Sequence, residues 1–413
     1  MPWKETDAMK ERVSLVLEWE RRWKSNKGGV NVSELCREFG VSRECGYKWI
    51  RRYRDAGRDL KAVEERSRKP RNSPTAVDEE MQNVVASARK AHPRWGPRKL
   101  RAVLVERHPG IAFPSASAIA AILKRRGLVL VKRCRRRSRI DPDVSPPFGA
   151  CRAPNHVWCV DFKGWFVTRD GRKCYPLTIT DAFSRYILRC EALSDPDGMA
   201  VYNVFDSVFS EFGLPAAIRS DGGPPFASTG PAGLTTLSVW WLRLGIRVER
   251  IAPGKPQQNG RHERMHRTLK ADVPPQGNAR RQQAAFDLWR REFNDERPHE
   301  ALALRPPTRI YVPSQERYPR KLLRPDVTDW DHIASVDRTG SIRFAGRKVF
   351  VSSALRNLAV ELERTDEHAW HVRWGRILLG RIDHLRLDRG LIPTRRLRGH
   401  VTVLSLNPND ADA

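Results

Sequence analysis

The sequence predicts a multidomain α and α/β protein: two helical units, then an α/β domain, then a small β domain expected to be a barrel. Its 413 residues are enough for several hydrophobic cores. Apolar residues recur at helical spacing through about the first 130 residues. Strand-like runs then alternate with helical patterns over residues 155–311, and only short strand-like runs broken by turns follow over 329–385.

The charge distribution is the second broad feature. The formal net charge is +28, and residues 1–140 hold 35 Lys and Arg against 16 Asp and Glu. Such an excess indicates a polyanionic partner, with nucleic acid favoured over an anionic membrane surface. No apolar run approaches the ~18 residues of a membrane span. The seven cysteines form no CxxC pair, which argues against a structural zinc site and favours reduced thiols in the cytoplasm.

Residues 1–56 are predicted to form a helix-turn-helix domain. Helices are expected over 9–24, over 32–39 and, after a Gly40-Val41 turn, from the N-cap Ser42 to about residue 54. The predicted small core is Leu35, Phe39, Val41, Trp49 and Ile50. The helix that begins after Ser42 is the second helix of the helix-turn-helix and would contact DNA. Its predicted outward side chains are Arg43, Glu44, Tyr47 and Lys48. A helical hairpin with a solvated basic face is the less favoured alternative.

A second helical unit, expected to be a helix-turn-helix-like DNA-binding domain, is predicted over residues 75–131, after a linker at 57–74. Its helices are expected at 78–91, 97–106 and 115–126, with Pro97 in a first turn that tolerates proline. Nine basic residues and no acidic ones occur between positions 124 and 139, and this run continues into a basic, Pro-rich linker predicted at 132–154. Such a run can be a solvated face, but contact with backbone phosphates is the better interpretation here. The predicted DNA contacts are Arg98, Lys99, Lys124, Arg125, Arg126, Arg135, Arg136 and Arg137.

The α/β domain is predicted to start with three strands, at 156–162, 173–180 and 186–191. A helix at 199–212, a strand at 216–220, a helix at 234–244 and a strand at 246–251 follow. Asp161 ends the first strand, Asp221 follows the fourth, and Glu263 begins the next helix. Each carboxylate alone has a structural explanation: a hydrogen-bonded Asp, an Asp-Gly turn, or a Glu paired with Arg267. Converging from two strands and a helix, however, they would form an oxygen-rich site suited to Mg²⁺.

Three motifs in this domain carry a family resemblance: Trp158-x-x-Asp161-Phe162, Ser220-Asp221-Gly222-Gly223, and Gln257-Gln258-Asn259-Gly260-x-x-Glu263. The set resembles the DDE insertion-sequence transposases of bacteria, in the branch closest to retroviral integrases, which have an RNase H-like core. Gly222 stands where the family often has Asn. Asp221 and Glu263 have 41 residues between them, more than is usual, and the excess is predicted to form a surface loop around 227–236.

The resemblance implies a function. It implies a transposase that binds the terminal inverted repeats, cuts the element ends and joins them to target DNA. Asp161, Asp221 and Glu263 would be the catalytic residues and the ligands of two Mg²⁺ ions, with Mn²⁺ able to substitute. The partners would be double-stranded DNA and further copies of the chain, at least a dimer assembled on DNA, in the bacterial cytoplasm at the nucleoid. The alternatives are a DNA-binding regulator with an inactive core and, less favoured, a general RNase H-like nuclease.

The regions around and beyond Glu263 complete the predictions. His266, Arg267 and Lys270 share a helical face with Glu263 and are expected to contact DNA phosphates. The barrel expected at 329–385 could contact either DNA or protein, and residues 386–413 are expected to be a loose tail.

Overall fold

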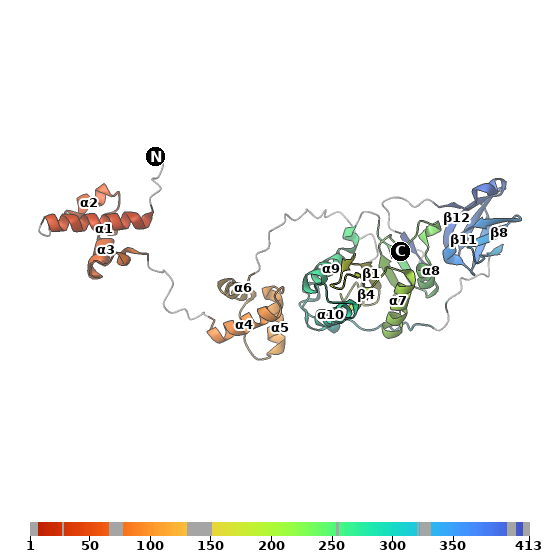
Figure 1. Cartoon of the computed structure of the whole chain (residues 1–413), viewed down its shortest axis with the longest axis horizontal. Helices are drawn as coiled ribbons and strands as arrows, with labels where there is room; N and C mark the ends of the chain where they lie inside the picture. The colour runs from red at the N-terminus through yellow and green to blue at the C-terminus, as the bar shows by residue number, and fades with distance from the viewer. Residues whose placement is uncertain are drawn as a thin grey trace. The chain divides into compact units, whose positions relative to one another are not determined.

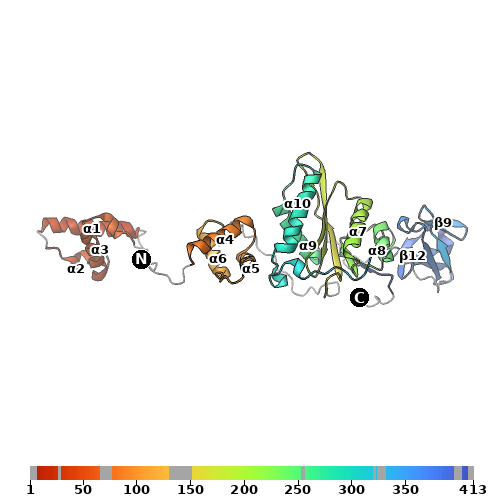
Figure 2. The same ribbon diagram turned by 90° about the horizontal axis from the view of Figure 1, so that it is seen from below.

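The computed structural model describes residues 7–26, 29–65, 77–129, 151–252, 256–319, 322, 332–394 and 402–407. The chain divides into two compact units, Met1–Val77 and Asp78–Ala413. Figures 1 and 2 show the elements of each unit in two orthogonal views. None of the described helices is both long enough and apolar enough to cross a membrane.

The first unit is a three-helix domain with the predicted helix-turn-helix arrangement. Its elements are α1 (Ala8–Ser25), α2 (Val32–Glu38), α3 (Arg43–Asp55) and the short 3₁₀ turn η1 (Leu60–Val63). Ser42 caps α3 by accepting a hydrogen bond from the backbone N–H of Cys45, as the sequence predicts. Gly46 lets α3 approach α2 closely, since a Cβ there would collide with Sγ of Cys36. The buried side chains of this core are Leu15, Val16, Trp19, Val32, Leu35, Cys36, Trp49, Ile50, Tyr53 and Val63.

The second unit begins with another set of three helices, also close to the predicted ranges. They are α4 (Glu79–Ala91), α5 (Pro97–Arg107) and α6 (Ala116–Arg125). Asp78 and Ser115 cap the first and third helices with their side chains. Trp95, Leu100 and Ile119 are among the buried side chains that hold the helices together.

The core of the second unit is a seven-stranded mixed sheet. In the order β14-β6-β5-β1-β3-β2, with β4 paired to β3, it has β1 at its centre. The strand β1 is parallel to β5 and antiparallel to β3, and β5 is parallel to β6. The strands are β1 (Val157–Phe162), β2 (Phe166–Val167), β3 (Lys173–Asp181), β4 (Ile187–Leu193), β5 (Ala217–Ser220), β6 (Arg247–Arg250) and β14 (Thr402–Leu404).

Helices cover both faces of this sheet (Figure 2). On one face, α7 (Gly198–Phe212) and α8 (Thr236–Arg243) pack against Trp158 and Val160 of β1. On the other face, α9 (Gly260–Asp272) and α10 (Ala279–Arg291), the latter continued by a π-helical turn η4 (Glu292–Glu296), pack against β3 and β4. Short 3₁₀ turns complete the domain: η2 (Pro231–Gly233), η3 (Pro256–Asn259), η5 (Glu300–Leu302) and η6 (Pro307–Arg309).

The C-terminal region is all β, as predicted, but closure into a barrel is not confirmed. Its described strands form an open antiparallel sheet in the order β13-β12-β11-β10-β7 and a separate hairpin β8-β9. The elements are β7 (Ile333–Ser335), β8 (Ser341–Phe344), β9 (Arg347–Phe350), η7 (Ser353–Leu355), β10 (Ala359–Arg364), β11 (Ala369–Trp374), β12 (Ile377–Asp383), η8 (His384–Arg389) and β13 (Ile392–Pro393).

One sequence-based expectation holds only in part here, and another is wrong. The segment 227–236 is largely a loop, as expected, and Thr229 and Gly230 are exposed, but Ala227 and Leu234 are buried. It lines a pocket together with residues of the C-terminal β region such as Phe350, so the longer interval before Glu263 supplies a contact surface. The tail is not loose at 402–404, because these residues pair with the exposed edge of β6 as strand β14.

Candidate active site

Asp161 and Asp221 lie at the carboxyl-terminal ends of the neighbouring parallel strands β1 and β5, and therefore on the same side of the sheet. Their parallel register pairs Cys159 with Arg219. Asp161 and Asp221 each lie two residues beyond that pair, so continuing the register places them side by side on strands about 4.8 Å apart. The rings of Phe162 and Phe226, 5.8 Å apart, confirm that the segments carrying the two carboxylates meet.

The environment of Asp161 opposes its negative charge. Burial raises its pKa to about 7, the nearby carboxylate of Asp221 adds to the shift, and Glu263 adds a smaller contribution. The Lys163 ammonium and a hydrogen bond from the backbone of Phe162 act in the opposite direction. Burial also raises the pKa of Asp221, against a hydrogen bond from the Gly223 N–H. The site therefore concentrates negative charge that its own cations do not fully compensate.

Helix α9 is attached to the sheet by a buried polar network centred on Thr178 of β3. The Thr178 hydroxyl lies 2.7 Å from Nε2 of both His262 and His266 and 3.0 Å from the carbonyl oxygen of Asp161. Thr180 contacts Nδ1 of His262 at 3.0 Å. Burial lowers the pKa of His262 to about 3 and that of His266 to about 2, so both imidazoles are neutral at physiological pH.

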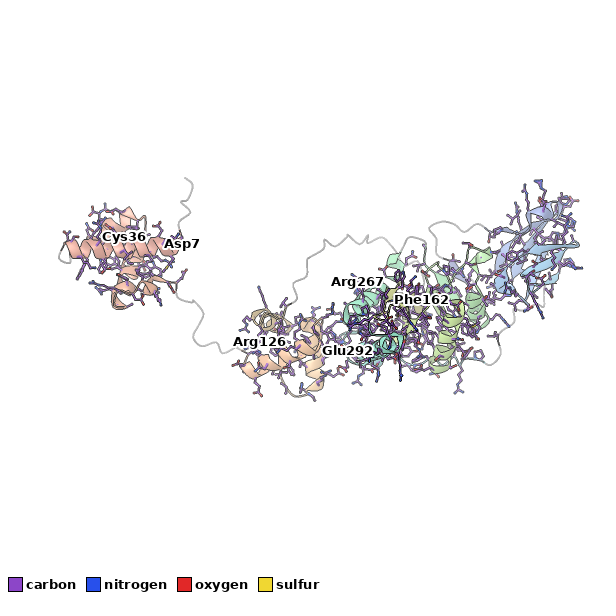
Figure 3. The ribbon with its side chains drawn as sticks, viewed as in Figure 1. Asp7, Cys36, Arg126, Phe162, Arg267 and Glu292 are labelled. Carbon is purple, nitrogen blue, oxygen red and sulfur yellow. The ribbon has the colours of Figure 1, made fainter. Side chains whose placement is uncertain are left out.

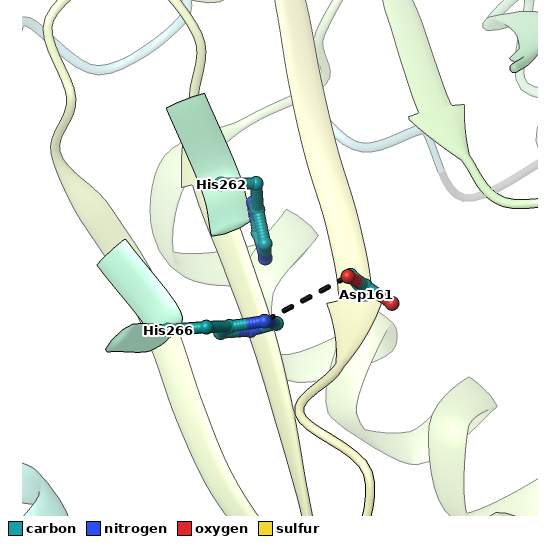
Figure 4. Close-up of side chains that lie close together, drawn as sticks. All are labelled: Asp161, His262 and His266. Carbon is teal, nitrogen blue, oxygen red and sulfur yellow. Dashed lines mark ion pairs between the residues drawn. The ribbon is translucent and has the colours of Figure 1, made fainter. Parts of the chain in front are cut away.

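Among the described residues, Asp161, His262 and His266 form a group whose potential metal-ligand atoms all lie within 4.8 Å of one another. Figure 4 shows the two imidazoles side by side on α9, with His266 directed at the Asp161 carboxylate. Glu263 is the residue after His262 and is exposed. Within the described chain no ion pair joins it to Arg267, so the helix-pairing explanation for this Glu lacks support. Asp221 and Glu263 are therefore near enough to Asp161 to affect its pKa, but the group with the shortest distances between possible ligand atoms is Asp161 with the two histidines.

The predicted DNA contact at His266 does not fit the structure. Its side chain is 5% exposed and turned into the protein, because its Nε2 hydrogen-bonds Thr178. Arg267 and Lys270, the other two predicted contacts on α9, are exposed (Arg267 is labelled in Figure 3). The exposed basic face of α9 therefore includes Arg267 and Lys270 but not His266.

The other predicted DNA contacts are mostly on the surface. Those that are exposed are Arg43, Glu44, Tyr47, Lys48, Arg98, Lys124 and Arg125. Arg126 is half-buried and donates a hydrogen bond to Asn83 at 2.6 Å. Lys99 is also half-buried, and burial, followed by the nearby Arg297, lowers its pKa to about 8. Arg135, Arg136 and Arg137 lie outside the described residues.

Sequence reasoning missed Thr178, Thr180 and His262. A signal was present, because two Thr alternate with Leu177 and Ile179 on a central strand, and two His stand one helical turn apart on the helix that carries Glu263. A polar stripe on an otherwise apolar strand indicates a polar partner across the interface. In contrast, Asp181 at the end of β3 caps a turn, accepting hydrogen bonds from the backbone of Asn155 and from Ser184.

Comparison with known families gives matches along most of the chain. Models described as "Integrase core domain" match residues 152–256 and 244–307. A "Homeodomain-like domain" model matches residues 45–123 and a "Helix-turn-helix domain" model matches 14–71. The first two matches contain Asp161, Asp221 and Glu263, and the last two cover the helical units that precede them.

Individual relatives agree with these matches. An uncharacterised 31.7 kDa protein of insertion element IS407 from Burkholderia multivorans is 29% identical over 216 residues, which are 51% of this chain and 72% of the relative. An uncharacterised 39.2 kDa protein of element IS476 from Xanthomonas euvesicatoria is 25% identical over 57% of this chain and 66% of its own length. Among solved structures, the HTLV-2 integrase catalytic core domain in complex with magnesium has 16% identity and a TM-score of 0.31, covering 39% of this chain and 98% of that one. The chain thus combines an integrase core domain with helix-turn-helix domains and is similar to proteins of insertion elements, which is consistent with an insertion-sequence transposase of the integrase superfamily.

Proposed function

We propose that the protein binds the terminal inverted repeats of its insertion sequence, cleaves the element ends and transfers the new 3′ ends to target DNA at Asp161, Asp221 and Glu263. One observation carries the proposal. Asp161 and Asp221 end adjacent parallel strands in the same register, and α9, which carries Glu263, is hydrogen-bonded to the next strand across the site. Open α/β sheets place their sites at this edge.

The side chains present fit divalent cations. Carboxylate oxygens are the preferred ligands of Mg²⁺, and the pKa of Asp161 is raised first by burial and then by the carboxylate of Asp221, so a cation beside these two groups would be stabilising. Two Mg²⁺ ions, which Mn²⁺ could replace, would supply Lewis-acid stabilisation of the attacking and leaving oxygens. Asp161, Asp221 and Glu263 would hold these ions, since both other carboxylates are close enough to affect Asp161.

The protein's own groups contribute in other ways. Arg267 and Lys270 are exposed on the helix of Glu263, where they can bind the phosphates on either side of the scissile bond. Cys159, two residues from Asp161, is not a candidate nucleophile, because burial raises the pKa of its thiol to about 12. Water, and then the DNA 3′-OH, would therefore be the nucleophiles, with no covalent protein–DNA intermediate.

DNA recognition would use the N-terminal helices. The exposed face of α3, with Arg43, Tyr47 and Lys48, has the composition of a helix that reads the major groove. The α4–α6 helices would extend the contact to a longer inverted repeat. Because transposition joins two element ends to one target, we propose at least a dimer that assembles on DNA at the nucleoid.

The test is to incubate the protein with labelled element ends and Mg²⁺ and to map the products. Nicks at the element ends followed by joined products support the proposed chemistry. Binding of the ends without cleavage, in Mg²⁺ and in Mn²⁺ alike, would instead support the regulator with an inactive core. Full cleavage in excess chelator would rule out the metal ions.

A further inference from the structure

The hydrogens around Thr178 can be assigned from its contacts. A Thr hydroxyl has one hydrogen to donate and two lone pairs to accept with. The carbonyl oxygen of Asp161 can only accept, so at 3.0 Å it takes the hydroxyl hydrogen of Thr178. Both histidine Nε2 atoms lie 2.7 Å from the same oxygen, so both must be donors. Each imidazole therefore carries its hydrogen on Nε2.

This assignment leaves both Nδ1 atoms as lone pairs. Nδ1 of His262 accepts a hydrogen bond from the Thr180 hydroxyl at 3.0 Å, so both nitrogens of this ring are occupied. Nδ1 of His266 faces Oδ2 of Asp161 at 3.7 Å. Among the described residues none donates a hydrogen bond to this nitrogen, and the histidine is 5% exposed. Two electron-rich atoms thus face each other across a gap at the candidate site.

We propose that Nδ1 of His266 is a nitrogen ligand of the divalent cation held by Asp161, a role that rests on the proposed metal site. Two ligands ~2.1 Å from one ion in tetrahedral or octahedral geometry are roughly 3.0–3.5 Å apart. The observed 3.7 Å between Nδ1 and Oδ2 needs only a small side-chain rotation to match. Figure 4 shows this nitrogen and the Asp161 carboxylate on opposite sides of the gap that the ion would occupy.

The hydrogen bond between His266 and Thr178 pre-orients the imidazole for binding the ion. Because Nε2 of His266 donates to Thr178, the ring is held with its lone pair toward Asp161, in the way outer hydrogen bonds orient metal-binding histidines. A nitrogen ligand also changes metal preference. Imidazole suits Mn²⁺ and heavier transition metals, whereas Mg²⁺ favours oxygen ligands. The structure therefore assigns this chain a stronger preference for Mn²⁺ over Mg²⁺ than three carboxylates alone would give.

The experiment measures Mn²⁺ bound to the full chain without DNA. Pulsed electron paramagnetic resonance detects the nuclear modulation of a nitrogen coordinated to Mn²⁺, and ¹⁵N-histidine labelling shifts that modulation if the nitrogen belongs to histidine. His266→Gln is the test variant, since its amide can still donate to Thr178 but has no lone pair in the place of Nδ1. His262→Gln, one turn earlier on the same helix, is the matched control, with thermal melting as the check on folding.

The expected result is a histidine modulation in the wild type that persists in His262→Gln and disappears in His266→Gln. His266→Gln should also lower Mn²⁺ affinity at least about tenfold, and Mg²⁺ affinity less. Mn²⁺ binding that needs Asp161 but shows no histidine modulation would overturn the role of His266 and leave the proposed function intact. A wild-type chain that binds no Mn²⁺ and cuts no DNA would overturn both. If a variant fails to fold, the labelled wild type still provides a test, because the absence of a histidine modulation in Mn²⁺-bound wild type overturns the role of His266.

Discussion

Helices α3 and α9 both present Arg and Lys side chains to solvent, but different forces hold them in place. The inner side of α3 is formed by Trp49, Ile50 and Tyr53, within a hydrophobic core. The inner side of α9 combines Met265 and Leu269 with two buried histidines that hydrogen-bond a neighbouring strand. Hydrophobic contact is non-directional, whereas a hydrogen bond loses most of its strength when its angle or length changes.

The difference agrees with the two roles proposed for these helices. In the proposed function, α3 presents its exposed residues to DNA from a hydrophobic base, and substitutions there should leave the helix in place. Helix α9 carries Glu263, and the buried hydrogen bonds to Thr178 and Thr180 restrict its rotation and its position along the strand. We therefore expect recognition and chemistry to be separable by substitution in this chain.

The largest effect is expected at the carboxylates. Asp161→Asn, Asp221→Asn and Glu263→Gln should each abolish cleavage and strand transfer, because the neutral amide cannot replace a charged metal ligand. Binding of the element ends should change little, since it rests on the N-terminal helices. Gel shift and cleavage assays on the same preparations measure both. Lys48→Ala is the matched control and should still cut at saturating DNA. Activity that survives in one carboxylate variant would remove that residue from the site.

The same contrast explains how much could be predicted from the sequence. Around α3, large apolar residues at Leu35, Trp49 and Ile50 mark the inner face, so the outward positions of Tyr47 and Lys48 follow directly. On α9 the inner face includes His262 and His266, which read as surface residues. Their partner Thr178 is 84 positions away from the first of them, and only the fold brings them together.

Contacts between residues far apart in the sequence also explain why strand β14 and the partial burial of 227–236 were not predicted. Every strand predicted in the sheet is present, but β14 forms only because residues 402–404 meet the open edge of β6, which no local pattern encodes. The Gly- and Pro-rich segment around 227–236 has the composition of a surface loop, yet only part of it is exposed, and it lines a pocket together with residues of the C-terminal β region. Asp161 and Asp221 were predictable because each directly ends an apolar strand, and strand ends at one edge of a parallel pair meet.

The second prediction concerns Thr178. Thr178→Val removes a hydroxyl shared by two buried imidazoles and one carbonyl group. An unpaired buried polar group costs about 1–3 kcal/mol, so we expect a loss of roughly 3–5 kcal/mol in the free energy of unfolding. Thr180→Val leaves one imidazole nitrogen unpaired and should cost roughly 1–3 kcal/mol. Denaturant unfolding measures both. Equal losses in the two variants would show that Thr178 is not the centre of the attachment.

The third prediction concerns recognition by α3. Tyr47→Ala or Lys48→Ala should weaken binding to the element ends by about 1–3 kcal/mol and relax preference at particular base pairs. Both side chains are exposed, so the melting temperature should stay nearly unchanged. Neutralising Lys124 and Arg125 should instead weaken binding to all sequences and reduce its salt dependence. Titrations against native and scrambled ends compare the two classes, and identical behaviour would refute a reading role for α3.

The smallest effect is expected in the pH dependence of stability without metal. The pKa of Asp161 is raised to about 7 from an ordinary value of 3.8, so the folded state binds more protons than the unfolded state between these limits. Stability should therefore fall as pH rises from about 4 to 7. The full shift would correspond to about 4 kcal/mol, and because the side chain is 25% exposed we expect about 1–2 kcal/mol.

In chelator, Asp161→Asn should be more stable than the wild type at pH 8 and lose that advantage at pH 4. Mg²⁺ should stabilise the wild type but not the variant. Unfolding curves at both pH values measure this, and a variant advantage that does not grow with pH would mean that Asp161 is not held in an uncompensated acidic cluster.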